Sequence, residues 1–121
     1  MKTTLLVATM LGIASVAGAQ DAPTPATLAQ GKAIFEGRQA GALCFTCHGM
    51  DGKGVPGLAP NLTDAKWLHG DGGLAFLQKL IKEGVPKPKE AAAPMLPMGG
   101  AKLSDDQIQA VASYVASLAK R

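Results

Sequence analysis

Three segments of the chain carry apolar residues at helical spacing. The first spans about residues 26–37, the second residues 74–83, and the third runs from Ser104 to the C-terminal region. Gly84 gives the second segment a C-terminal stop, and Ser104 with Gln107 forms the capping-box pattern S-x-x-Q at the start of the third. The apolar positions that we expect to face the core are Leu28, Ile34 and Phe35; Leu74, Leu77, Leu80 and Ile81; and Ile108, Val111, Ala112, Val115 and Leu118.

The stretches between these segments show no alternation of apolar and polar residues, so no strand is predicted. Residues 49–72 are dense in glycine, and residues 85–97 contain four prolines, which favour an extended or irregular backbone. Loops of this length in a small domain are usually functional. The sequence therefore predicts an all-α domain with three main helices and two long loops.

The N-terminus has the composition of a secretory signal peptide. Lys2 gives it a positive start, residues 5–16 form an apolar run, and Ala17-Gly18-Ala19 is an A-x-A cleavage site. The run is shorter than the roughly 20 apolar residues of a membrane span; an uncleaved membrane anchor is the alternative. We therefore divide the chain into a signal peptide (1–19), a flexible leader (20–26) and one domain (27–121), with no membrane span after cleavage.

Composition and charge argue against binding of nucleic acid or nucleotides. The formal net charge is only +3, lysines and arginines form no run, and aromatic residues make up 4% of the chain. Residues 52–57 match the G-x-G-x-x-G fingerprint of dinucleotide-binding proteins, but no predicted strand precedes them, and Pro56 and Pro60 prevent the helix that should follow. We expect neither class of partner.

The strongest chemical signal is Cys44-Phe45-Thr46-Cys47-His48, which has the C-x-x-C-H pattern of covalent haem attachment. Two thiols about one helical turn apart can add across two vinyl groups of a porphyrin, and the adjacent imidazole can bind the iron. Structural zinc would need four Cys or His ligands, and the whole chain has two of each, with His48 crowded against Cys47. A thioredoxin-like dithiol would need a βαβ unit, which the pattern does not predict.

The residues alone do not decide which side chain would be the second axial ligand of such an iron. Met50 is two positions from His48 and is too close in sequence to reach the opposite face of a ring. Met95 and Met98 lie in the proline-rich loop, which suits a strap over that face. His69 is a further candidate ligand or a surface histidine, and Met98 is a ligand or a thioether packed against the ring.

Together with the predicted helices, the motif resembles that of a class I cytochrome c of the bacterial periplasm. The resemblance covers nearly all of the mature chain. It rests also on Gly31-Lys32-x-Ile34-Phe35, on Ala59-Pro60-Asn61-Leu62, and on the segment from Leu103 to Tyr114, which is similar to the family's closing helix. Residues 60–70 are most similar to the haem domains of cbb3-type oxidase subunits.

The resemblance implies the cytochrome c fold, with long loops wrapped around one covalently attached haem c. Cys44 and Cys47 would attach the haem, and His48 would be the proximal ligand, with its ring N–H donating to the carbonyl of Pro60. In the family's M-P-x-x-G-G pattern the first methionine is the other axial ligand. The segment Met95-Leu96-Pro97-Met98-Gly99-Gly100 puts Met95 in that place, although Leu96 stands where proline is common, and Met98 is the alternative.

The resulting hypothesis is a periplasmic electron-transfer protein with His/Met ligation, cycling between Fe(III) and Fe(II). Its partners would be redox proteins, a dehydrogenase or a terminal oxidase. The alternatives are a haem subunit permanently docked to such an enzyme, and a five-coordinate haem enzyme acting on peroxide or a small gas, for which no distal His/Arg pair is evident. Four loop lysines would either steer an acidic partner or simply be solvated: Lys53, Lys87, Lys89 and Lys102.

Overall fold

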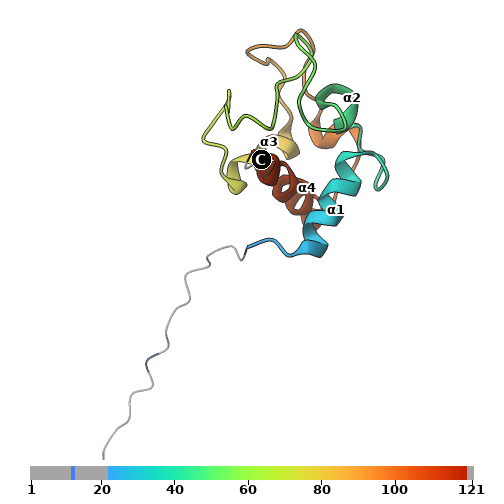
Figure 1. The fold of residues 1–121 in the computed structure, drawn as a ribbon, viewed down its shortest axis with the longest axis vertical. Coiled ribbons are helices and arrows are strands. Elements are labelled where there is room, and N and C mark those ends of the chain that lie inside the picture. Colours follow the sequence, from blue (N-terminus) through green and yellow to red (C-terminus); the bar gives the residue numbers. More distant parts are fainter. Residues whose placement is uncertain (1–11, 13–21, 120–121) are drawn as a thin grey trace, which may run out of the picture.

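The computed structural model of the chain describes residue 12 and residues 22–119. The elements of this part are α1 (Pro25–Phe35), α2 (Cys44–His48), α3 (Leu74–Glu83), the 3₁₀-helix η1 (Pro97–Gly100) and α4 (Asp105–Leu118) (Figure 1). The described residues form no β-strand, only two isolated bridges, Val55 with Ala59 and Val85 with Met95. The predicted all-α fold is confirmed. The predicted signal peptide lies outside the described residues except for Gly12.

Helix α1 begins two residues earlier than the boundary of the predicted domain. The hydroxyl of Thr24 accepts a hydrogen bond from the backbone N–H of Thr27 (3.1 Å), and Pro25 occupies the first helical position. Pro25 and Ala26, the last two residues of the predicted leader (20–26), therefore belong to the helix, which begins one residue before the predicted segment 26–37. The helix ends at Phe35 and not at Gly37, which adopts a left-handed backbone (φ 72°).

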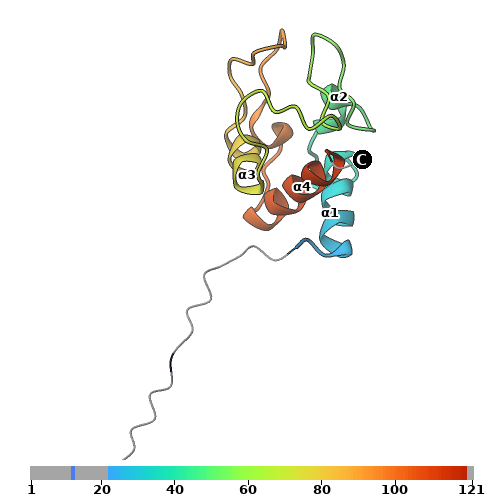
Figure 2. The same ribbon diagram turned by 60° about the vertical axis from the view of Figure 1, so that its left-hand side comes forward.

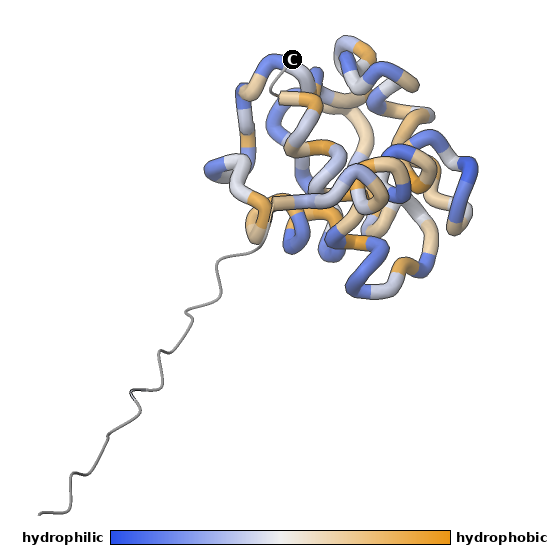
Figure 3. The backbone as a smooth tube through the Cα atoms, turned by 60° about the horizontal axis from the view of Figure 1, so that its bottom comes forward, coloured by the Kyte–Doolittle hydropathy of each residue, from blue (hydrophilic) through white to orange (hydrophobic). Residues whose placement is uncertain are grey.

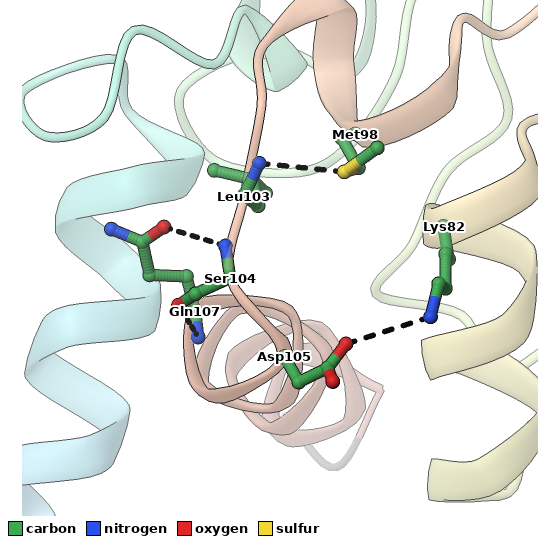
Figure 4. Close-up of polar contacts among 6 residues, drawn as sticks. All are labelled: Lys82, Met98, Leu103, Ser104, Asp105 and Gln107. Carbon is green, nitrogen blue, oxygen red and sulfur yellow. Dashed lines mark hydrogen bonds and ion pairs between the residues drawn. The ribbon is translucent and has the colours of Figure 1, made fainter.

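The predicted capping box in front of α4 is present. The Oγ of Ser104 accepts from the backbone N–H of Gln107 (3.2 Å), and the side chain of Gln107 accepts from the N–H of Ser104 (2.9 Å) (Figure 4). Asp105 and Asp106 occupy the first turn, where negative charge is favourable. The start of α4 is thus fixed by local contacts.

The core is centred on α4, which packs against α1 on one side and against α3 on the other (Figures 1 and 2). At the crossing of α1 and α4, a Cβ added to Gly31 would overlap the carbonyl oxygen of Ala110. The rings of Phe35 and Tyr114 meet edge to face there, with centroids 5.4 Å apart. This close approach explains the glycine inside α1, which otherwise costs helix stability.

The two long loops lie beyond one end of this helical core. They rise next to each other between α2 and α3 in Figure 2, and the N–H of Ala92 in one donates to the carbonyl of Gly57 in the other (2.9 Å). The hydropathy colouring places many hydrophilic positions at the outer bends of the loops and helices (Figure 3). Residues of both loops and of the helices line a common cavity.

Candidate functional site

Helix α2 consists of the C-x-x-C-H motif itself. It ends at His48 because Gly49 follows with a left-handed backbone (φ 77°), and the N–H of Gly49 bonds to the carbonyl of Phe45 (2.9 Å). Residues three apart in a helix share a face, so Cys44 and Cys47 point the same way. Both are free thiols, both are partly buried, and both line a common cavity with His48.

The environment of His48 fixes which ring nitrogen carries the proton. Its Nδ1 lies 3.1 Å from the carbonyl oxygen of Pro60. A carbonyl oxygen only accepts hydrogen bonds, so Nδ1 donates and the lone pair of the neutral ring is on Nε2. Burial lowers the pKa of the imidazole, and the contact with Pro60 opposes part of this shift. His48 is therefore held as a neutral ring with one nitrogen available to a metal.

The glycine-rich loop holds the Pro60 carbonyl in place through close backbone contacts. The N–H of Gly54 donates to the carbonyl of His48 (2.7 Å), and that of Leu62 donates to Gly52 (2.7 Å). A Cβ added to Gly54 would lie 2.5 Å from the carbonyl oxygen of Ala59 and 2.6 Å from that of Pro60, and its φ is 78°. Through these contacts the glycine-rich loop folds back onto the motif.

A largely apolar cavity opens above α2. It measures about 1450 Å³ when its open mouth is included. The wall opposite the motif comes from α3, α4 and the two long loops. Its main apolar side chains are Leu62, Trp67, Phe76, Leu77, Leu80, Ile81, Val85, Leu96, Val111 and Val115, and Phe35 at the end of α1 also lines the cavity.

The cavity wall differs in part from what the sequence predicted. Leu77 and Leu80, which were predicted to be buried, line it together with Leu62 and Leu96, whereas Met98, a candidate to bind the iron or pack against the ring, does not. Trp67, Phe76 and Val85 were not foreseen, because they lie in loop or at a helical position outside the predicted buried stripe. The signal that could have found them is their large apolar side chain in or next to a loop already assigned to a prosthetic group.

The candidate axial methionines occupy different surroundings. Met95 is partly buried and lines the cavity, and its backbone pairs with Val85 through N–O distances of 2.9 and 3.0 Å. Met98 instead directs its sulfur to the backbone N–H of Leu103 (3.4 Å) (Figure 4). Met50 is 53% exposed and does not line the cavity. The structure thus brings Met95, and not Met98, together with His48.

Polar side chains also line the cavity, among them those of His69 and Lys66. His69, which the sequence left as a candidate ligand or a surface residue, is half-buried in its wall. Lys66 lines the wall as well, although sequence analysis did not single it out. The four lysines predicted to rim the site are exposed and do not line the cavity: Lys53, Lys87, Lys89 and Lys102.

These residues fit a covalently attached porphyrin. The chamber is apolar, two free thiols lie on one face of α2, and a neutral imidazole is buried beside them. Burial raises the pKa of the Cys44 thiol, which favours its protonated form. Residues 12 and 22–119 contain no group of three or more His, Cys, Asp or Glu side chains that could hold a metal ion by themselves.

A family model for cytochrome c matches residues 28–119. The chain belongs to the cytochrome c family. The members of this family carry haem c on the C-x-x-C-H motif, so this chain is an electron-transfer protein with covalent haem c bound through Cys44 and Cys47. The resemblance proposed from the sequence is confirmed.

Curated proteins with similar sequences include subunits of cbb3-type oxidases. The chain is 46% identical over 80 residues to the cbb3-type cytochrome c oxidase subunit CcoP of Rhodobacter capsulatus, which covers 62% of this chain and 25% of the relative. It is 38% identical over 113 residues to the subunit FixP of Bradyrhizobium diazoefficiens, covering 89% of this chain and 37% of the relative. The chain therefore spans only about a quarter to just over a third of these relatives.

A solved structure shares the fold. A chain of the Kuenenia stuttgartiensis reducing HAO-like protein complex superposes with a TM-score of 0.59 and 25% sequence identity, over 79% of this chain and 45% of that one. Within the described part of this chain, none of the helices has the length and apolar character required for a membrane crossing.

Proposed function

We propose that this chain is an exported, periplasmic electron carrier in which His48 and Met95 are the two axial ligands of the haem iron. The observation that carries the proposal is the division between the methionines. Met95 lines the same apolar cavity as His48, whereas the sulfur of Met98 is engaged by the backbone of Leu103. With two protein ligands the iron has no open position for a substrate, which favours electron transfer over catalysis.

Bound haem c supplies a one-electron couple between Fe(III) and Fe(II). The protein residues set its potential in three ways. A methionine ligand paired with histidine raises the potential. The apolar wall disfavours the extra charge of the ferric form. The Pro60 carbonyl, at 3.1 Å from Nδ1 of His48, orients the imidazole and increases its donor strength, which acts in the opposite direction.

The ferric absorbance spectrum of the holoprotein tests the ligand assignment. We expect the long-wavelength band of a sulfur-to-iron bond in the wild-type protein, its loss in Met95→Leu, and its retention in Met98→Leu. Met50→Leu is the matched control, because Met50 is an exposed methionine outside the cavity. Loss of the band in Met98→Leu alone would reverse the assignment. High-spin ferric haem at neutral pH in the wild-type protein would favour the five-coordinate enzyme instead.

A second candidate role is that of a fixed subunit. It is favoured by the relatives, which are named as subunits of cbb3-type oxidases. The four exposed loop lysines, Lys53, Lys87, Lys89 and Lys102, would then help to orient an acidic partner. Purification from native cells separates the two roles: a shuttle is released with the periplasmic fraction, whereas a fixed subunit co-purifies with a membrane oxidase or dehydrogenase in detergent.

A further inference from the structure

The turn that follows Met95 has an unusual backbone. Met98 and the residue after it, Gly99, both adopt left-handed conformations, with φ values of 54° and 63°. Glycine or asparagine takes this conformation at little cost, whereas a long side chain is uncommon there. The shape of the turn therefore gives no reason for a methionine at position 98, and the reason must be sought in its side chain.

The side chain of Met98 ties the turn to the start of α4. Its sulfur accepts a hydrogen bond from the backbone N–H of Leu103 (3.4 Å). Leu103 is 7% exposed and directly precedes Ser104, the N-cap of α4. A buried backbone N–H needs an acceptor, and here the acceptor is a thioether five residues earlier in the chain (Figure 4). This hydrogen bond therefore links η1 to the start of α4.

The same turn also contacts the haem-attachment helix. The carbonyl of Gly99 accepts from the N–H of Leu43 (3.0 Å), and a Cβ added to Gly99 would lie 3.1 Å from the sulfur of Cys44. At its other end the strap is held by the pairing of Met95 with Val85. The backbone of Met95 is therefore one anchored point, and the next along the chain is Gly99, whose position depends on how the turn at 98–100 is held.

We propose that Met98 is a positioning residue for the axial ligand. Its thioether, by accepting from the Leu103 N–H, holds the turn so that Met95 stays in the cavity and Gly99 stays against Cys44. The inference rests on the proposed function, in which Met95 is an iron ligand. It gives the second methionine of the segment a task that requires its sulfur and not merely its volume.

The rate at which external imidazole replaces Met95 on the ferric holoprotein tests this task. Met98→Leu keeps the side-chain size but removes the acceptor, and Met98→Gln keeps an acceptor within reach. We expect Met98→Leu to speed the replacement by about two- to tenfold, the factor supplied by one hydrogen bond. Met98→Gln should stay close to the wild-type rate, and so should the exposed control Met50→Leu. The sulfur-to-iron band should persist in all three.

Each other outcome overturns the inference. An unchanged rate in Met98→Leu shows that the contact does not hold the ligand, and an equal acceleration in Met98→Leu and Met98→Gln shows a packing role only. Loss of the band in Met98→Leu shows that Met98 is itself the ligand, so that the proposed function fails as well. If the variants do not fold, amide hydrogen exchange of the reduced wild-type protein decides: the Leu103 amide must exchange more slowly than that of exposed Lys102, and equal rates overturn the proposal.

Discussion

The two sides of α4 are completed in different ways. Toward α1 the protein fills the interface by itself, with Gly31 against Ala110 and Phe35 against Tyr114. Toward α3 the residues Val111 and Val115 border the haem cavity. One side is a helix crossing specified by the chain, and the other is a wall shaped for a prosthetic group. The difference teaches that the amino-acid sequence encodes only part of the core and that haem c supplies the rest.

The two sides meet at Phe35. Its ring packs against Tyr114 in the helix crossing, lines the cavity, and lies 6.4 Å from the imidazole of His48 between ring centroids. For variants on either side of α4, the change in unfolding free energy can therefore be compared with the change in the absorbance spectrum or the reduction potential of the iron.

The largest effect should come from preventing haem attachment with Cys44→Ala and Cys47→Ala together. Without the porphyrin the cavity side has too few apolar contacts to pay for ordering the loops. We expect loss of the cooperative thermal transition, with amides of α1 and α4 exchanging more slowly than those of α3. A transition at the wild-type temperature would show that the chain completes both sides without haem.

Gly31→Ala should break the helix crossing. The new Cβ would overlap the Ala110 carbonyl, and backbone must move to relieve it. We expect a loss of about 3 kcal/mol in the free energy of unfolding, measured by denaturant titration, while the ferric spectrum is retained. Ala29→Ser, at an exposed position of the same helix, should cost less than about 0.5 kcal/mol. Equal midpoints for both variants would contradict the close crossing.

Gly54→Ala acts on the cavity side and has a matched control in Gly57→Ala. Both glycines have a φ of 78°, but only at Gly54 would a Cβ meet the Ala59 and Pro60 backbone, since nothing lies within 4 Å of the one at Gly57. We expect Gly54→Ala to cost about 1–2 kcal/mol more than the control. Displacing the Pro60 carbonyl from His48 should also raise the reduction potential. Equal reduction potentials in the two variants, measured by redox titration, would show that the position of this loop does not affect the iron.

The smallest effect is expected at the capping box. Ser104→Ala removes the acceptor for the Gln107 N–H and should cost about 1 kcal/mol of unfolding free energy, whereas Ser104→Asp should retain most of it. Denaturant midpoints measure the loss. Because the cap belongs to α4, the sulfur-to-iron band should not change. A weaker band in Ser104→Ala would mean that the start of α4 and the ligand strap are coupled more tightly than the comparison assumes.

The sequence predicted the elements that are specified by residues close together in the chain. Periodic apolar residues located α1, α3 and α4, and the S-x-x-Q pattern located the start of α4 at Ser104. The C-x-x-C-H motif identified the cofactor because its spacing is dictated by the porphyrin. Helix α1 begins at Pro25, one residue before the segment that the apolar spacing predicted, because its start is set by the cap contact of Thr24 and not by apolar residues.

What the sequence left open depends on tertiary contacts. Met95 and Met98 are the same residue type in the same loop, and they are told apart by a backbone amide at Leu103 and by the pairing with Val85. Phe76 lines the cavity from a position of α3 outside the predicted buried stripe, and Trp67 lines it from a loop, whose geometry no periodic pattern describes. His69 was undecided for the same reason. The ligand assignment of the iron stays a prediction until the spectra of the variants are measured.

The backbone contacts of the loop that carries Met95 allow one part of this loop to vary in length. Pairing of Val85 with Met95, and the bond from Ala92 to Gly57, leave residues 86–91 as a segment whose two ends are held independently of its length. Loop closure costs only about 0.6 kcal/mol for each doubling of loop length. Insertions there would alter the outline of the molecule while Met95 stays where it is, so this hairpin is the natural place to graft a new recognition element onto an unchanged redox centre.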